Sequence, residues 1–144
     1  MHPYPHVYKV SAGGSAEGDV RLASAGLPEL PSQAPPEFGG PEGYWSPETL
    51  LAAAVADCFV LSFRAVARAS KLQWTSVSAE VDCVLDRVEG VAHFTRVTTR
   101  ARLVVPAGTD ATRAHQLLEK AEKVCLISNS LKAERRLEAE VVRG

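Results

Sequence analysis

Cysteine, net charge and long apolar runs are scarce in this chain, and each shortage excludes a class of protein. The 144 residues contain 3 cysteines, an odd and small number that argues against a secreted domain held by a disulfide framework. A formal net charge of −1 provides no global field toward nucleic acid or an anionic membrane. Residues 1–6 lack the basic segment and apolar core of a secretory signal, and no apolar run approaches the roughly 20 residues of a membrane-spanning helix. We therefore expect a cytoplasmic, reducing location.

Common metal-binding and catalytic motifs are also missing. His2 and His6 are four residues apart, but the prolines beside them prevent a helix that would bring both rings to one metal. Gly13-Gly14 lacks the longer pattern and the lysine of a phosphate-binding loop, and no Gly-x-Ser-x-Gly elbow occurs. The remaining composition, 46% hydrophobic and 23% charged, is that of an ordinary soluble globular protein, and the length suits one domain over residues 1–144.

The N-terminal part of the chain is predicted to contain little regular structure. Residues 7–10 and 18–22 are suited to short strands, with Gly13-Gly14 as the turn between them. Residues 26–46 are rich in proline and glycine, and loops of this length are usually functional or disordered. Tyr44 and Trp45 favour an ordered, packed loop over a flexible linker.

A long helix is predicted to begin at Ser46-Pro47 and to run to about Ser70. Serine is a preferred N-cap, proline is favoured at the first helical position, and Glu48 places a negative charge in the first turn. Apolar residues cover nearly all sides of this segment, which is typical of a buried helix. We expect it to form the centre of the fold.

The rest of the sequence predicts further strands and helices. Alternating apolar and polar residues predict strands over 77–86 and 93–105, joined by a hairpin turn. A helix capped by Thr109 or Asp110 should follow, and then a short helix near 125–131 and a final strand containing Leu137, Ala139 and Val141. This order of elements predicts an α+β fold.

Cys58 and Cys125 lie in short apolar contexts at opposite ends of the chain and are candidates for a redox-active thiol pair. A lone cysteine is usually a small buried hydrophobic residue, and this interpretation is favoured for Cys83 on the apolar face of a strand. Cys58, midway along the predicted buried helix, fits either role. Cys125 begins a helix, where free N–H groups and the dipole favour the thiolate. The two could form a disulfide if their Cα atoms come within about 4.4–6.8 Å.

A thiol pair of this kind could reduce a peroxide. One thiolate attacks the O–O bond, becomes a sulfenic acid and releases an alcohol, and the second thiol condenses with it to a disulfide. The attacking sulfur needs a lowered pKa and therefore a nearby cation or hydrogen-bond donors.

Two segments resemble the OsmC-like branch of the OsmC/Ohr family of thiol-dependent hydroperoxide reductases. One is Glu37–Phe59, with Glu-Phe-Gly-Gly-Pro-Glu-Gly-Tyr-Trp-Ser-Pro-Glu-Thr-Leu-Leu, and the other is Val-Cys-Leu-Ile-Ser-Asn-Ser-Leu around Cys125. Leu126 stands where many members have proline, and the order of elements is similar over almost the whole chain. The resemblance implies an OsmC-like α+β fold, with antiparallel sheets wrapped around long buried central helices in an intertwined homodimer.

The resemblance also implies residue roles. Cys58 would attack the peroxide and Cys125 would resolve, although the helix-start argument gives Cys125 the better electrostatic position. Glu48 matches the carboxylate that orients an arginine near the reactive thiol. Glu48 and Cys58 are about 15 Å apart along a helix and on different faces, so Glu48 would have to come from a second chain. Classical organic-hydroperoxide-resistance members carry this arginine directly after the Gly-Gly turn, where this chain has Ser15, and Arg21 on the following strand is a candidate substitute that would stabilise the thiolate.

These implications lead to the hypothesis of a homodimeric peroxidase that reduces organic hydroperoxides in oxidative-stress defence. Its apolar substrate pocket would be lined by Phe38, Tyr44, Trp45 and Phe59. An external dithiol or a lipoylated protein would restore the thiols. No metal, cofactor, nucleic acid or membrane is expected as a partner. The missing arginine keeps open an alternative, a non-catalytic small-molecule binding protein with the same fold. A thioesterase-like protein, also built on a long central helix, is a third alternative.

Overall fold

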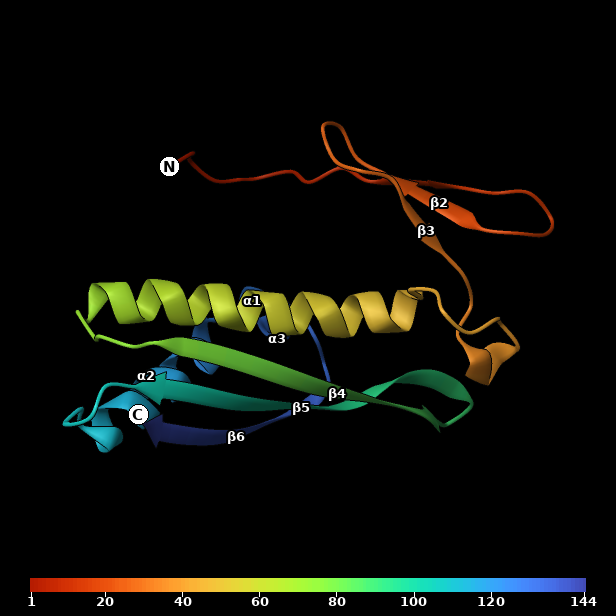
Figure 1. Ribbon diagram of the computed structural model, residues 1–144. Helices are drawn as coiled ribbons and strands as arrows, with labels where there is room; N and C mark the ends of the chain where they lie inside the picture. Colours follow the sequence, from red (N-terminus) through yellow and green to blue (C-terminus); the bar gives the residue numbers. More distant parts are fainter. The chain divides into compact units, whose positions relative to one another are not determined.

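The computed structural model describes residues 1–144 and divides them into two compact units, Met1–Leu50 and Leu51–Gly144 (Figure 1). Each unit is described by itself. The longest helix, α1 (Pro47–Ala69), begins in the first unit and continues through the second. The expectation of one domain over residues 1–144 stays a prediction.

The first unit contains a small antiparallel sheet in the order β1-β2-β3. Its strands are β1 (Ser11–Gly13), β2 (Val20–Ala23) and β3 (Leu30–Ser32), and a short 3-10 helix, η1 (Pro36–Phe38), follows. The predicted strand over 7–10 is wrong. β2 ends at Ala23, opposite Ser11, so residues before Ser11 face no partner strand within the sheet. The predicted long loop over 26–46 is wrong in part, because it contains β3 and η1.

α1 begins where the sequence predicts. The Ser46 hydroxyl accepts a hydrogen bond from the Thr49 N–H at 3.1 Å, and the Ser46 N–H donates to the Thr49 hydroxyl at 2.8 Å. This reciprocal pair satisfies two backbone donors that have no partner within the helix. Pro47 then occupies the first helical position, where its missing N–H has no cost.

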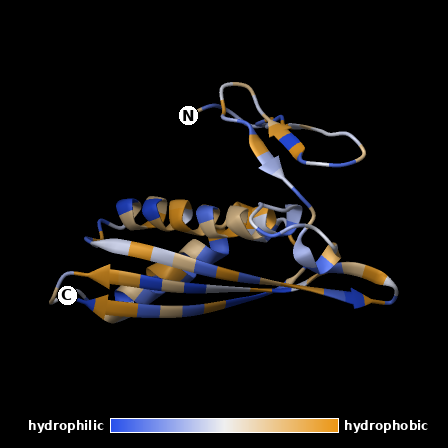
Figure 2. Ribbon diagram, turned by 45° about the vertical axis from the view of Figure 1, so that its right-hand side comes forward, coloured by the Kyte–Doolittle hydropathy of each residue, from blue (hydrophilic) through white to orange (hydrophobic).

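Only one side of α1 is buried within the chain. The buried residues are Val55, Phe59, Phe63, Val66 and Ala67, whereas Leu61 is 51% exposed. The expectation of burial on nearly all sides is therefore wrong for a single chain. By length and composition α1 could also cross a membrane, contrary to the expectation from apolar runs, because its charges leave an apolar window of 18 residues. Core helices of soluble proteins have the same property. Figure 2 shows hydrophobic residues on several turns of α1, interspersed with hydrophilic ones.

The second unit contains a three-stranded sheet in the order β4-β5-β6, formed by β4 (Ser76–Val88), β5 (Val91–Val105) and β6 (Glu134–Arg143). β4 and β5 form a long antiparallel hairpin. Glu89 and Gly90 both have positive φ values, 53° and 79°, as a tight two-residue hairpin turn requires.

β6 pairs with β5 in the parallel direction, so the expectation of purely antiparallel sheets is wrong at this pair. Parallel neighbours need a crossover connection, and here it consists of α2 (Ala111–Val124) and α3 (Leu126–Asn129). Asp110 caps α2, because its carboxylate accepts the N–H groups of Thr112 and Arg113 at 2.9 and 3.3 Å.

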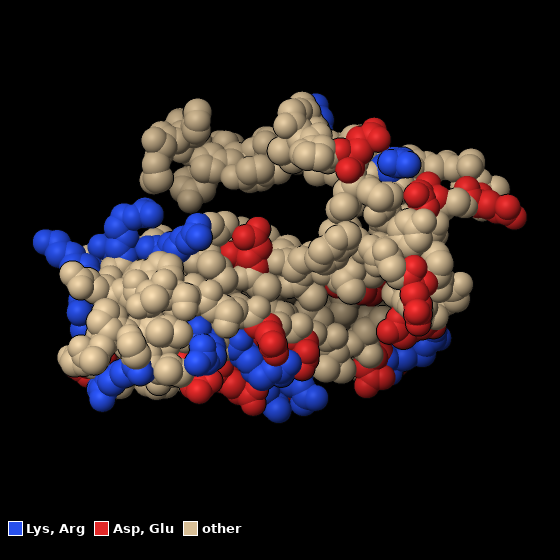
Figure 3. Space-filling model, viewed as in Figure 1, with Lys and Arg blue, Asp and Glu red and all other residues tan.

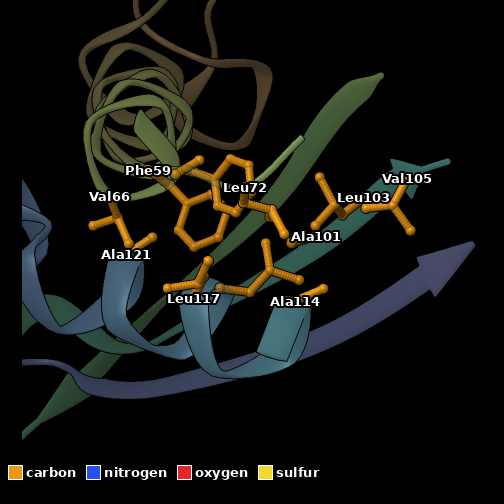
Figure 4. Packing of buried hydrophobic residues seen from close by; sticks show 12 residues of the cluster. Phe59, Val66, Leu72, Ala101, Leu103, Val105, Ala114, Leu117 and Ala121 are labelled. Atoms are coloured by element: carbon orange, nitrogen blue, oxygen red, sulfur yellow. The ribbon is translucent and has the colours of Figure 1, made fainter. Parts of the chain in front are cut away.

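The main core of this unit lies between α1, α2 and the inner face of β5. Figure 4 shows Phe59 and Val66 of α1 facing Leu117 and Ala121 of α2. The inner face of β5 is buried as its alternating pattern predicts, through Val97, Thr99, Ala101, Leu103 and Val105. Phe63 packs edge-on against the Trp74 ring, with centroids 5.4 Å apart.

The outer face of this sheet carries charges of both signs. Arg100 lies 2.7 Å from Asp82 and within 3.9 Å of Glu80 and Glu138, and Arg102 lies 3.8 Å from Glu140. Figure 3 shows Lys and Arg interleaved with Asp and Glu on this side of the sheet. Such mixed pairs form a solvated strand face and not a basic stripe of the kind that binds nucleic acid.

Candidate thiol site

The structure brings the two candidate cysteines together. Cys58 lies midway along α1, and Cys125 lies at the junction of α2 and α3. Both are free thiols, and they lie close enough for each to shift the pKa of the other. Cys58 is partly exposed, whereas Cys125 is fully buried beside it. A reagent from solvent therefore reaches the Cys58 sulfur first.

Cys58 opens onto a shallow groove of about 420 Å³ in the surface of the second unit. Its lining is mainly apolar and comes from one side of α1 and from the start of α3: Ala54, Asp57, Cys58, Leu61, Ser62, Ala65, Leu126 and Ile127. Asp57 is the one charged residue in this set. The groove therefore offers an apolar surface next to a sulfur nucleophile.

Hydrogen-bond donors around Cys58 favour its thiolate. Burial by itself raises the pKa of Cys58, but the N–H groups of Ile127 and Leu126, the Cys125 thiol and the Ser62 hydroxyl together bring this pKa below the usual thiol value. The Ser62 Oγ lies 3.9 Å from the Cys58 Sγ. No cation is among these causes, so hydrogen bonds alone account for the lowered pKa.

The pKa of Cys125 is shifted in the opposite direction, above the usual thiol value. Burial raises its pKa, hydrogen bonds from Ser128 oppose this, and the contact with Cys58 raises it further. The argument that the helix start makes Cys125 the more readily ionised thiol is therefore wrong. The helix start does supply N–H donors, but those of Leu126 and Ile127 serve the sulfur of Cys58. Proximity in sequence suggested that these donors serve Cys125, but the fold places them beside Cys58.

Arg135 holds the turn that carries Cys125. From β6, its Nε donates to the Glu122 carboxylate at 2.8 Å and its Nη1 to the Asn129 side chain at 2.5 Å, while Nη2 donates to the Glu122 carbonyl. Glu122 and Asn129 flank Cys125 in sequence, so one guanidinium fixes both ends of this turn. Sequence reasoning gave no role to Arg135, because nothing local to it indicates these distant partners.

Residues 39–140 match the family model OsmC, described as OsmC-like protein. The chain belongs to the OsmC-like family. Peroxiredoxin OsmC of Escherichia coli (strain K12) is 30% identical over 118 residues, which cover 82% of this chain and 81% of the relative. YmaD of Bacillus subtilis (strain 168), named as an uncharacterized protein, is 26% identical over 144 residues, 96% of each protein. A crystal structure of an organic hydroperoxide resistance protein OsmC from Legionella pneumophila is 28% identical, covers 97% of this chain and 99% of its own, and superimposes with a TM-score of 0.76.

These comparisons confirm the OsmC/Ohr resemblance and the OsmC-like α+β fold. The match to the OsmC-like family model includes both Cys58 and Cys125, and it crosses the boundary between the two compact units. The names of the relatives indicate peroxide chemistry within the family.

Cys83 behaves as a structural thiol in this OsmC-like protein, as the sequence predicts. It packs against the small core cluster of Val55, Val97 and Ala133. Burial and, to a lesser extent, the neighbouring Asp82 carboxylate raise the pKa of Cys83, so its thiolate is disfavoured.

Phe59, one of the four residues of the predicted aromatic pocket, does not line the groove beside Cys58. Phe59 is fully buried in the main core, on the side of α1 that faces α2, so it does not line the groove (Figure 4). Successive helical residues lie about 100° apart, which is why the neighbour of Cys58 faces elsewhere. Phe38, Tyr44 and Trp45 are exposed in the first unit, and their role in substrate binding stays a prediction.

Glu48 and Arg21 also lie in the first unit. Glu48 is in the first turn of α1, and its Oε1 is buried without a hydrogen-bond partner. Arg21 is exposed on β2 and lies 3.9 Å from Glu29. Their predicted roles next to Cys58 stay predictions. No group of three or more histidine, cysteine or acidic residues is arranged to hold a metal ion.

The different environments of the thiols predict different pH profiles of alkylation. Because only the thiolate reacts, Cys58 should be modified by iodoacetamide with a midpoint below that of an ordinary thiol, since its pKa is lowered. Cys83, whose pKa is raised, should have its midpoint above that value. Peptide mass spectrometry of samples alkylated over a pH series measures both sites in one experiment. A Cys58 midpoint at or above that of Cys83 would contradict this description of the site.

Proposed function

We propose that this OsmC-like protein is a thiol-dependent peroxidase that reduces organic hydroperoxides to alcohols. The observation that carries the proposal is the proximity of two free thiols, of which the more exposed one, Cys58, has a lowered pKa and opens onto an apolar groove. A structural cysteine needs neither the donors nor the second thiol.

The proposed reaction has two steps in the protein. The Cys58 thiolate attacks one peroxide oxygen, the O–O bond breaks, and the alkoxide takes up a proton and leaves as the alcohol, so the sulfur is oxidised to a sulfenic acid. The Cys125 thiolate then attacks this sulfur, a disulfide forms, and the hydroxide that leaves is protonated to water. An external dithiol or a lipoylated protein reduces the disulfide by thiol–disulfide exchange, with no bound cofactor.

The lining of the groove supports an organic substrate. Leu61 of α1 and Leu126 of α3 are 51% and 65% exposed, and both line the groove onto which Cys58 opens. Burying an alkyl chain against such side chains is favourable, by roughly 25 cal/mol for each Å² removed from water. Hydrogen peroxide has no apolar part that could gain this energy. Alkyl or lipid hydroperoxides are therefore the proposed substrates.

The proposed active form is a cytoplasmic homodimer. Support comes from the uncovered apolar side of α1 and from the buried, unpartnered Oε1 of Glu48. In this proposal Glu48 of a second chain orients an arginine beside Cys58, and Arg21 is the candidate for that arginine. Isologous pairing would create two equivalent composite sites.

Disulfide mapping tests the proposed function. The reduced chain is treated with one equivalent of cumene hydroperoxide, remaining thiols are alkylated, and peptides are identified by mass spectrometry. We expect a Cys58–Cys125 disulfide and an alkylated Cys83. In a Cys125→Ser variant, the same treatment should leave a sulfenic acid on Cys58 that dimedone traps. If all three thiols stay alkylatable after treatment, the proposal fails and the non-catalytic binding protein is favoured.

A further inference from the structure

Each thiol of the pair has a serine hydroxyl beside its sulfur. Ser62 follows Cys58 by one turn of α1, and its Oγ lies 3.9 Å from the Cys58 Sγ. Ser128 follows Cys125 by three residues on α3, and its hydroxyl lowers the pKa of the Cys125 thiol against the effect of burial. The two serines come from different elements and affect different thiols.

The environment of the Ser128 hydroxyl is unusual for a buried polar group. Ser128 is 1% exposed, and its hydroxyl has no hydrogen-bond partner in the resting site. Buried hydroxyl groups are almost always paired, and leaving one without a strong partner costs about 1–3 kcal/mol. An uncharged thiol is a weak acceptor, whereas a thiolate at the same place would be a strong one. The hydroxyl is thus placed for a charge that Cys125 carries only during part of a reaction cycle.

We propose that Ser62 and Ser128 divide the reaction between them: Ser62 donates to the Cys58 sulfur while Cys58 attacks the hydroperoxide, and Ser128 donates to the Cys125 sulfur while Cys125 attacks the Cys58 sulfenic acid. This inference rests on the proposed peroxidase function. Both serines are positioning residues, because they act on the substrate through a sulfur atom.

The two steps need different donors because the charge moves from one sulfur to the other. In the resting site the Cys125 thiol is itself a donor to Cys58, so Cys125 keeps its proton. Once Cys58 is a neutral sulfenic acid, the negative charge that opposed ionisation of Cys125 has gone. Cys125 is fully buried, so water cannot solvate its thiolate, and the Ser128 hydroxyl is the side-chain donor that remains.

Single-turnover kinetics of Ser62→Ala and Ser128→Ala test the division. Ser62→Ala should slow formation of the sulfenic acid by about three- to tenfold near neutral pH, the size expected for one ordinary hydrogen bond, and should move the alkylation midpoint of Cys58 to higher pH. Ser128→Ala should form the sulfenic acid at the wild-type rate but should close the disulfide about three- to tenfold more slowly. Dimedone trapping at timed intervals should then reveal transient sulfenic acid on Cys58.

The chain offers a matched control and a rescue. The Ser130 hydroxyl, next to α3, donates to the Leu126 carbonyl and not to sulfur, so Ser130→Ala should leave both steps unchanged. Ser62→Thr keeps a hydroxyl and should restore most of the attack rate. Both alanine variants should fold, because alanine suits a helix and the Ser128 hydroxyl has no hydrogen-bond partner that its removal would leave unpaired.

The outcomes separate this inference from the proposed function. If wild type forms no disulfide with cumene hydroperoxide, the peroxidase proposal itself fails. If wild type turns over but both alanine variants slow the same step, or neither changes a step, the division between the serines is wrong. Equal slowing by Ser128→Ala and Ser130→Ala would also overturn it, because the effect would then come from α3 and not from the bond to sulfur.

Discussion

Replacing Cys58 by serine should lower the rate of cumene hydroperoxide consumption, with dithiothreitol as the reductant, by at least about 10³-fold. A serine hydroxyl stays protonated at neutral pH, so the donors around this position no longer stabilise a charged nucleophile. Residual consumption should equal that of dithiothreitol alone. A coupled assay of peroxide remaining against time, with and without protein, measures the difference.

Cys83→Ser is the matched control for this substitution. Cys83 is a partly buried thiol whose pKa is raised, so removing it should leave the rate of peroxide consumption unchanged. Cys125→Ser should abolish disulfide formation but allow one round of attack at Cys58. Equal rates for wild type and Cys58→Ser would remove the enzyme hypothesis, whatever the Cys83 variant does.

The elements that could be predicted from the sequence are those with local causes. The start of α1 depends on Ser46, Pro47 and Thr49, which are adjacent in the chain. The start of α2 depends in the same way on the Asp110 cap. The inner face of β5 follows from the alternation of its own residues. In each case the physical reason lies within a few residues of the element itself.

The features that were missed have distant causes. The parallel pairing of β5 and β6 depends on where the crossover through α2 and α3 returns the chain. Which sulfur ionises depends on the N–H groups of Leu126 and Ile127, which are far from Cys58 in sequence. Sequence alone placed these donors beside Cys125, their neighbour in the chain, and so assigned the lowered pKa to the wrong thiol.

The same contacts give a physical answer to the missing arginine. The resemblance to classical organic hydroperoxide resistance proteins implies an arginine after the Gly-Gly turn, where this chain has Ser15. The donors of α3, Ser62 and the Cys125 thiol lower the pKa of Cys58 against the cost of its burial, without help from a cation. Loss of the arginine therefore does not by itself imply loss of the reactive thiolate. This weakens the main argument for a non-catalytic binding protein.

The core that holds α1 against α2 and β5 should be sensitive to loss of Phe63. Phe63 is fully buried and packs edge-on against Trp74, so Phe63→Ala removes a large apolar side chain and leaves a cavity. We expect the free energy of unfolding to fall by about 3–5 kcal/mol. Urea denaturation followed by circular dichroism, at one fixed protein concentration, measures this change.

Phe38→Ala makes the same chemical change at an exposed position. Phe38 is 61% exposed at the end of η1, so little transfer energy is lost and no cavity forms. We expect its free energy of unfolding to stay within about 0.5 kcal/mol of wild type. A loss of less than about 1 kcal/mol for Phe63→Ala would contradict the described packing, because a residue with no exposed surface cannot be truncated so cheaply unless the neighbouring side chains close the cavity. Since α1 carries both Phe63 and Cys58, any such rearrangement should also move the Cys58 alkylation midpoint, and this second measurement distinguishes collapse of the core from an error in the placement of Phe63.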